Sequence, residues 1–161
     1  MKNIFIEKIV CNIGCGKELP IDNAKIILTR LTNKKPVITK SAKRSTFGVT
    51  KGKPIGCKIT IRNDIETFVK RFLTAKENKL KKSSFDDKGN FAFGVKEYID
   101  VPDMEYDPKI GIIGMDVCIT LSRPGYSIKR KKNPHKIGKK HMITKEEAMK
   151  FIKETYNVEL E

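Results

Sequence analysis

Few residues in this chain have the types and spacing that chemistry requires, and none completes a catalytic motif. Gly14-Cys15-Gly16-Lys17 is similar to part of a phosphate-binding loop. That loop needs a glycine five residues before the Gly-Lys pair and a serine or threonine after it. The chain has Cys11 and Glu18 at those positions, which argues against nucleotide hydrolysis. We expect a tight connection between a strand and a helix instead.

The cysteines and histidines do not indicate a metal site. Cys11 and Cys57 lie in strand patterns, where a buried thiol acts as a small apolar group. Cys118 alternates with apolar neighbours and should be less buried. His135 and His141 lie in a basic segment without a carboxylate to orient them. We therefore expect no metal, no cofactor and no catalytic residue.

An acidic patch spans residues 97–107. Its members are Glu97, Asp100, Asp103, Glu105 and Asp107, and the wider segment 98–109 holds two prolines. Calcium-binding loops use tighter spacings that a glycine fixes. Two interpretations stay open: a solvated loop, or a surface that binds a basic protein neighbour.

Positive charge is concentrated in two segments. The 161-residue chain has 34 Lys and Arg against 19 Asp and Glu, a formal charge of +15. Residues 23–63 hold eleven basic residues and residues 117–145 hold nine, and neither segment holds an acid. Such a chain repels itself unless a polyanion is its normal neighbour. The distribution favours a nucleic-acid partner, because each cation placed on a phosphate releases a counterion.

Other function classes are disfavoured by composition. Hydrophobic residues make up 39% of the chain, enough for a packed interior. No apolar run approaches the length of a membrane span, and the N-terminus does not resemble a secretory signal. We expect a cytosolic protein with reduced cysteines. With 7% aromatic residues and no Trp, structured RNA is a better partner than a single strand stacked on rings.

Hydrophobic periodicity predicts alternating strands and helices. Period-two patterns predict strands over 4–13, 37–49, 55–62, 91–98 and 117–122, with a hairpin turn at 50–53. Helices should begin at Pro20, at Asn63 or Asp64, and at Thr144. Glu66 and Glu147 are placed to complete capping boxes. Residues 124–141 should form a basic loop, 79–90 a turn or flexible loop, and 98–109 an irregular connection.

The segment 55–62 shows the clearest two-faced strand. Its odd positions, 55 to 61, are apolar, and Lys58, Thr60 and Arg62 fall on the opposite face. We therefore predict an α+β fold in two layers. A mainly antiparallel β-sheet has helices packed on one face and an open basic face, with an extended hairpin and a basic loop.

Several segments resemble one protein family, in the same order along the chain. They are Ile6–Gly16, Lys35–Lys43, the Thr46-Phe-Gly-Val stretch, Pro54–Arg62, Asp87–Glu97, Tyr106–Asp116 and Arg123–Tyr126. Together they resemble the universal large-subunit ribosomal protein that binds 5S ribosomal RNA, known in bacteria as L-five. The basic loop and terminal helix are similar to the archaeal and eukaryotic branch. The short length and the absence of an N-terminal extension resemble archaeal members.

The resemblance implies a role and partners. The protein would be a structural constituent of the large ribosomal subunit, in the central protuberance, bound to 5S rRNA and large-subunit rRNA. Its hairpin tip would approach peptidyl-site tRNA, and it would meet a small-subunit protein. Asn12 falls on the family's strand-end asparagine that contacts 5S RNA. Lys34 stands where members usually have Gln, so a group that donates and accepts hydrogen bonds becomes a donor only.

From the residues and the resemblance together, we predict a single ribosomal RNA-binding domain over residues 1–161, in which 129–140 become ordered on RNA. Three groups of contacts are expected. For 5S rRNA they are Asn12, Lys34, Lys40, Lys43, Lys58, Thr60 and Arg62. For the hairpin near tRNA they are Thr46, Phe47, Lys51 and Lys53. For the basic loop on rRNA they are Lys129, Arg130, Lys131, Lys132, Lys136, Lys139 and Lys140.

Two competing hypotheses remain. One is an RNA-processing or RNA-modifying enzyme that uses the same basic face, although the histidines and the acids of 97–107 assemble no acid/base pair. The other is an adaptor that binds proteins through the acidic segment.

Overall fold

The computed structural model describes residues 1–15, 20–44 and 48–161. The predicted contact residues Thr46 and Phe47 lie outside the described residues, and so does the Gly16-Lys17 pair of the strand-to-helix connection.

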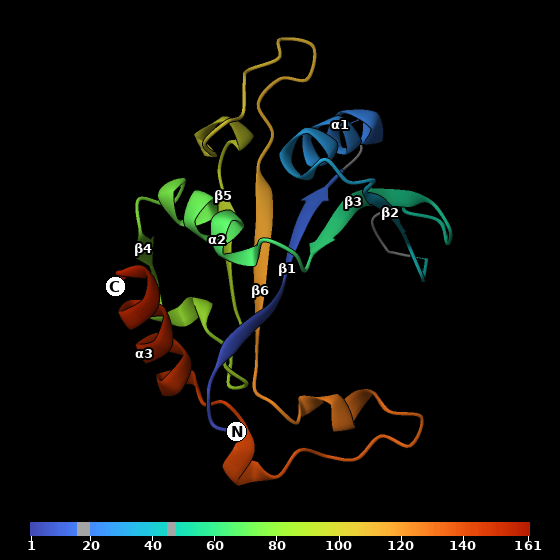
Figure 1. The fold of residues 1–161 in the computed structure, drawn as a ribbon. Coiled ribbons are helices and arrows are strands. Elements are labelled where there is room, and N and C mark those ends of the chain that lie inside the picture. Colours follow the sequence, from blue (N-terminus) through green and yellow to red (C-terminus); the bar gives the residue numbers. More distant parts are fainter. Residues whose placement is uncertain (16–19, 45–47) are drawn as a thin grey trace.

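One antiparallel sheet forms the centre of the molecule, with the strand order β2-β3-β1-β6-β5 (Figure 1). Its strands are β1 (Phe5–Gly14), β2 (Val37–Lys40), β3 (Pro54–Ile61), β5 (Phe91–Val95) and β6 (Met115–Ser122). Two short strands, β4 (Lys79–Leu80) and β7 (Glu159–Leu160), pair in parallel beside it. The helices are α1 (Ile21–Thr32), α2 (Ile65–Thr74) and α3 (Lys145–Tyr156). The predicted α+β class with a mainly antiparallel sheet is confirmed.

The core lies between one face of the sheet and the helices. Ile9, Cys11 and Ile13 of the central strand β1 point into it and are almost fully buried. Alternate residues of β6 and β5 join them, including Val117 and Phe91. α1 packs on β3 and α2 packs on β1. The alternation of buried and exposed residues follows the period of two that a half-covered strand requires.

The predicted helices are present, and their ends agree only in part with the predicted caps. α1 buries Ala24, Ile27, Leu28 and Leu31, as its spacing predicts. At the start of α3, Thr144 and Glu147 form the predicted capping box. The capping box predicted for α2 is wrong. Asp64 has a left-handed backbone (φ 53°) and makes no side-chain cap hydrogen bond, so Glu66 has no partner there.

The predicted hairpin is shorter than its sequence pattern. β2 ends at Lys40, because the register with β3 shifts between Thr39 and Lys40 and only Ser41 continues the hydrogen bonding, to Gly52 and Lys53. A turn closes at Lys53, whose amide donates to the carbonyl of Thr50 (3.3 Å). The predicted arm over 37–49 is therefore wrong for the described residues beyond 41.

Two further expectations are corrected. The period of two predicts a buried Ile55, but this residue is 39% exposed. Cys57, the next core position of β3, is buried under α1, where its thiol donates to the carbonyl of Ile21 (3.8 Å). Residues 79–80, expected in a turn or flexible loop, form the short strand β4, which pairs with β7 and buries Leu80.

Close strand packing at Gly56 generates a stability prediction. Gly56 lies opposite Gly14 and Thr39, and a Cβ added there would be 2.5 Å from the backbone oxygen of Ile13. Gly56→Ala should lower the free energy of unfolding by about 1–3 kcal/mol, because backbone has to move. Gly94→Ala is the matched control, since its nearest atom would be 3.8 Å away. Urea denaturation of both variants is the measurement, and equal unfolding midpoints would contradict the close packing at Gly56.

Candidate nucleic-acid interface

The face of the sheet that points away from the core carries a polar row across three strands. In this row Asn12 of β1 is the register partner of Lys58 on β3 and of Asp116 on β6. Lys58 and Asp116 are exposed, and Asn12 is half-buried between them. Side chains directly opposite each other in an antiparallel pair lie about 5 Å apart at Cβ. A cation, an amide and a carboxylate therefore stand next to one another, and together they can donate to and accept from an RNA surface.

Much of the rest of this face is made of small side chains. Beside the polar row, Thr60 pairs with Val10, Val10 pairs with Cys118, and Cys118 pairs with Ala92. Gly94 lies opposite Asp116. Short side chains leave little relief, so a backbone or a shallow groove of structured RNA can approach closely. A-form RNA offers such a groove, lined with 2′-hydroxyls and phosphates.

Sequence reasoning placed Lys58 and Thr60 on this face, expected Cys118 to be exposed, and gave Asn12 through the resemblance. Lys8, Asp116 and Thr120 share it but were missed, although the alternation of buried residues in β6 from Met115 to Leu121 was a usable signal. Asp116 also changes the electrostatics of the face. Its centre holds both signs of charge, and most of the cations lie around it.

The predicted cations are exposed, and Asn12 and Thr60 are half-buried, but these residues do not all come together. Lys34 follows the end of α1, and Lys40 ends β2. Lys43, Lys51 and Lys53 are exposed in the segment that joins β2 to β3. Lys58 and Asn12 lie side by side, with Thr60 two residues further along β3.

Arg62 is placed differently from Lys58. It follows the last residue of β3 and lines a hollow with Ile65 of α2, Phe151 of α3 and the beginning of β1. Arg62 is therefore separate from the polar row. The alternation along 55–62 predicted instead that Arg62 shares the open face with Lys58 and Thr60.

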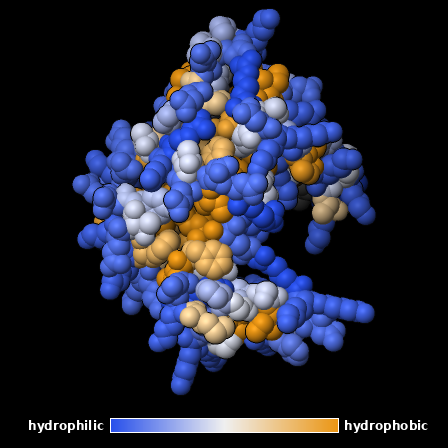
Figure 2. All heavy atoms as spheres, viewed as in Figure 1, coloured by the Kyte–Doolittle hydropathy of each residue, from blue (hydrophilic) through white to orange (hydrophobic). Residues whose placement is uncertain are grey.

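The basic loop extends from the end of β6 on the same side of the molecule as the β2–β3 pair (Figure 1). Figure 2 shows an open space between these two projections, with mostly hydrophilic residues around it. All seven predicted cations of the loop, from Lys129 to Lys140, are exposed. The arrangement presents positive charge around an open space that a folded nucleic acid can enter.

Buried polar contacts anchor the two ends of this loop. Arg123 is only 6% exposed; it donates to the carbonyls of His141 and Met142 and forms an ion pair with Glu147 (2.9 Å). The hydroxyl of Tyr126 donates to the carbonyl of His141 (3.2 Å) and accepts from the amide of Ile143 (2.9 Å). Along the loop, Arg130 forms an ion pair with Glu7 of β1.

The acidic segment is held by cations of the helices. Asp107 forms an ion pair with Arg30 of α1 (2.9 Å), and its pKa is lowered by the amide of Lys109 and by Arg30. Its own amide donates to the hydroxyl of the buried Tyr98 (3.0 Å). Arg71 of α2 donates to the carbonyl of Pro102 (2.6 Å). The segment predicted as irregular is thus fixed at Pro102 and at Asp107. An exposed apolar side chain, Tyr106, lies within it, and a second, Ile112, follows it.

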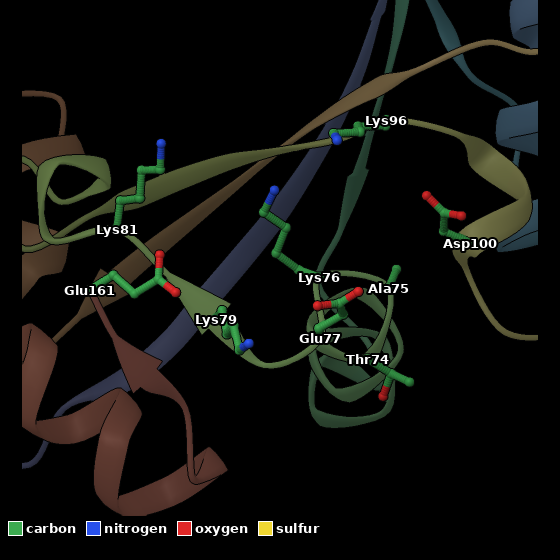
Figure 3. A pocket seen from close by; sticks show the side chains of 9 residues that line it. All are labelled: Thr74, Ala75, Lys76, Glu77, Lys79, Lys81, Lys96, Asp100 and Glu161. Atoms are coloured by element: carbon green, nitrogen blue, oxygen red, sulfur yellow. The ribbon is translucent and has the colours of Figure 1, made fainter.

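A hollow near the C-terminus gathers four lysines but balances their charge. Figure 3 shows Lys76, Lys79, Lys81 and Lys96 around it, together with Glu77, Asp100 and Glu161. The lysine side chains come from the turn after α2, from β4 and from the ends of β4 and β5. Three carboxylates among four ammonium groups leave little net charge, so this hollow is less suited to a polyanion than the basic loop.

The thiols give no sign of nucleophilic chemistry. Burial raises the pKa of Cys11 to about 12, with a smaller contribution from Cys118. The pKa values of Cys15, Cys57 and Cys118 are also raised, mainly by burial, so the thiolate form is disfavoured. Cys118 is exposed, as predicted. Among the residues that the structure describes, no three His, Cys, Asp or Glu side chains gather as metal ligands. No described helix has the length and apolar character that crossing a bilayer requires.

Comparison with known proteins identifies the relatives of the chain. The model for the C-terminus of the ribosomal L-five protein family matches residues 54–151. The large ribosomal subunit protein uL5 of Sulfolobus acidocaldarius is 46% identical, covering 98% of this chain and 91% of that protein. The uL5 of Cenarchaeum symbiosum is 44% identical over 99% and 97% of the two chains. That of Pyrobaculum aerophilum is 43% identical over 100% and 92%.

An α+β sheet with basic projections, matched along nearly its whole length by ribosomal proteins, defines a structural protein of the large ribosomal subunit. The chain belongs to the uL5 family, and these relatives are archaeal, as the resemblance implied. Members of this family are structural rather than enzymatic, which removes the RNA-processing hypothesis. The protein is therefore a constituent of the ribosome, in the cytoplasm. Binding of rRNA is typical of its family.

The anchor of the basic loop should depend on pH through Glu147. The amide of Thr144 and the guanidinium of Arg123 lower its pKa below the ordinary value of 4.5. A lowered folded-state pKa stabilises the fold above the ordinary pKa, and this stabilisation disappears as the pH falls through the folded-state value. At pH 7, Glu147→Gln should lower the free energy of unfolding by only about 1 kcal/mol, because water screens a half-exposed carboxylate.

Denaturation of wild type and variant between pH 7 and pH 3 is the measurement. The difference between the two proteins should shrink as the pH falls below 4.5 and disappear once the pH is below the lowered folded-state pKa, where Glu147 is itself neutral. Glu146→Gln, in the same helical turn, is the control and should have little effect. A difference that is constant across the pH range would contradict the role of the Glu147 charge.

Proposed function

We propose that this protein binds 5S rRNA and large-subunit rRNA in the central protuberance, with residues 1–161 acting as a single rRNA-binding domain. The observation that carries the proposal is the row of Lys58, Asn12 and Asp116 on a sheet face without helices, flanked by two basic projections. The resemblance supplies the identity of the RNA, and the surface supplies a physical reason for binding it.

The 5S rRNA surface has a centre and an edge in this proposal. At the centre, Asn12 and Thr60 provide amide and hydroxyl groups that can bond to base edges and 2′-hydroxyls. Lys58 stands beside them for a phosphate. Lys34, Lys40, Lys43 and Arg62 lie further out and contribute phosphate contacts that fix the register of the RNA. Lys34 in place of the usual Gln retains such a phosphate contact.

The two projections are proposed to bind different RNAs. The cations of the basic loop, Lys129, Arg130, Lys131, Lys132, Lys136, Lys139 and Lys140, bind large-subunit rRNA, and residues 129–140 become fully ordered as phosphates neutralise them. Lys51 and Lys53, exposed at the turn between β2 and β3, approach peptidyl-site tRNA together with Thr46 and Phe47. No cofactor takes part in either contact.

The acidic segment is proposed to meet the small-subunit protein. It is held by Arg30 and Arg71, so it presents a fixed shape rather than a loose loop. It combines carboxylates with an exposed apolar side chain, Tyr106 (54% exposed), and a second one, Ile112 (63% exposed), follows shortly after it. A basic protein surface with an apolar patch complements this combination, whereas RNA phosphates would be repelled by it.

Replacing Lys58 tests the RNA surface. Lys58→Ala should weaken 5S rRNA binding about three- to tenfold and lower the slope of log K against log salt by roughly 0.7–0.9, since one phosphate contact is lost. The melting temperature of the free protein should stay unchanged, because Lys58 is exposed and makes no ion pair among the described contacts. Gel-shift titrations at several salt concentrations give both quantities.

Lys153→Ala is the control, because Lys153 is exposed on α3, away from the sheet face. If both variants bind 5S rRNA as wild type does, Lys58 is not at the interface. If wild type binds no 5S rRNA, or binds it without a dependence on salt, the proposed function itself is wrong.

Replacing the exposed apolar side chains in and just after the acidic segment tests the protein contact. The double change Tyr106→Ser and Ile112→Ser should reduce association of the large and small subunits, while 5S rRNA binding stays at the wild-type level. Sedimentation of reconstituted subunits measures their association, and gel shift measures 5S rRNA binding. Ile26→Ser, at an exposed isoleucine of α1, is the control. Unchanged subunit association in the double variant would locate the small-subunit contact elsewhere.

A further inference from the structure

A pocket of about 570 Å³ lies between the basic loop and the ends of β1 and β6. Its apolar lining comes from Leu121, Tyr126, Pro134, Ile137, Met142 and Ile143. None of the predicted contacts explains an apolar pocket in a segment that is otherwise almost entirely basic and polar.

One side of this pocket is held in place by contacts within the fold. Leu121 and Ile143 belong to the buried core. Tyr126 is held from both sides, because its hydroxyl bonds to the backbone at His141 and Ile143. Ile137, half-buried, closes the pocket from the loop. The side of the pocket formed by Leu121, Tyr126 and Ile143 is therefore in place before binding, which lowers the entropic cost of receiving a ligand, and the loop residues complete the pocket as the loop becomes ordered on RNA.

The rim of the pocket is strongly cationic. Lys88, Lys129, Lys136 and Lys139 lie around it, and His135 adds a second ring to that of Tyr126. Glu7 is the single acid of the lining, and it is already paired with Arg130. An occupant must therefore combine an apolar, flat part with negative charge at its edge.

We propose that the pocket receives one unstacked base of ribosomal RNA, with the phosphates on either side of that base bound by the lysines of the rim. This rests on the proposed function and adds to it a single-nucleotide site. An aromatic base fits the apolar lining, and its own backbone supplies the charge that the rim requires. Proteins read single-stranded loops and bulges of RNA in this way, by inserting bases next to aromatic side chains.

Two isoleucines of the basic loop allow a matched test. Ile137 lines the pocket, whereas Ile128 is 40% exposed in the same loop and does not line it. Large subunits are assembled with wild type, Ile137→Ala or Ile128→Ala. The reactivity of unpaired bases toward dimethyl sulfate and carbodiimide is then mapped over the whole rRNA.

The expected result is at least one unpaired base that wild type protects and whose reactivity rises about three- to tenfold with Ile137→Ala. The map with Ile128→Ala should equal that of wild type. As a second variant, Lys139→Ala should expose the same base and also lower the salt slope of rRNA binding, which Ile137→Ala leaves unchanged.

Identical maps for all three proteins would overturn the inference, and so would a protein segment cross-linked inside the pocket. Either result leaves rRNA binding itself intact. Failure of the proposed function has a different readout, since wild type would then be absent from the assembled subunits.

Discussion

The alternation of side chains along β1 is the constraint on which the rest of the structure depends. β1 pairs with β3 on one side and β6 on the other, so its register fixes the faces of both. Ile9, Cys11 and Ile13 face the helices, and Val10 and Asn12 face the opposite side. A slip of one residue would exchange the two sets and place polar groups under the helices. The same register that builds the core therefore builds the polar row.

A bulge in β1 keeps the core residues on one face of the strand and places one extra residue where it contacts the basic loop. Ile6 packs against the core, yet it lies three residues before Ile9, an odd spacing that would place the two on opposite faces. The irregular register between Ile6 and Lys8 inserts one extra residue and corrects the parity. Glu7 is that residue, and it forms the ion pair with Arg130 of the loop. A local irregularity in the sheet thus provides an attachment point for a distant basic segment.

Much of the fold follows from the sequence, because its central elements have strong periodicity. The strands around Ile9 and Ile119 and the helices α1 and α3 could be predicted from local spacing alone. Contacts between distant segments could not. Nothing local indicates that Leu80 pairs with the last residues of the chain, or that Tyr98 is buried beneath an acidic segment. The shortening of β2 likewise depends on a register shift.

The candidate site shows the same division between local and distant information. The exposure of Lys58 followed from the alternation in β3, and the exposure of Cys118 from that in β6. The partners of Asn12 could not be predicted from a local pattern, because Lys58 and Asp116 become its neighbours only through pairing of β1 with two other strands. Arg62 continues the alternation in sequence but lies beyond the end of the strand, where the constraint no longer acts. The single-nucleotide pocket needs both the loop and the sheet, and no local pattern predicts it.

The way in which the basic loop is held leaves its positive charge available. Arg123 fixes the end of the loop through backbone carbonyls and Glu147, and Tyr126 fixes it through its hydroxyl. Of the seven loop cations, Arg130 alone forms an ion pair among the described residues. A loop anchored by its own cations would have to break those pairs to bind phosphates. Because other groups hold this loop, six of its cations can bind RNA without breaking contacts of the fold, and the net charge of +15 that opposes folding of the free chain contributes directly to binding.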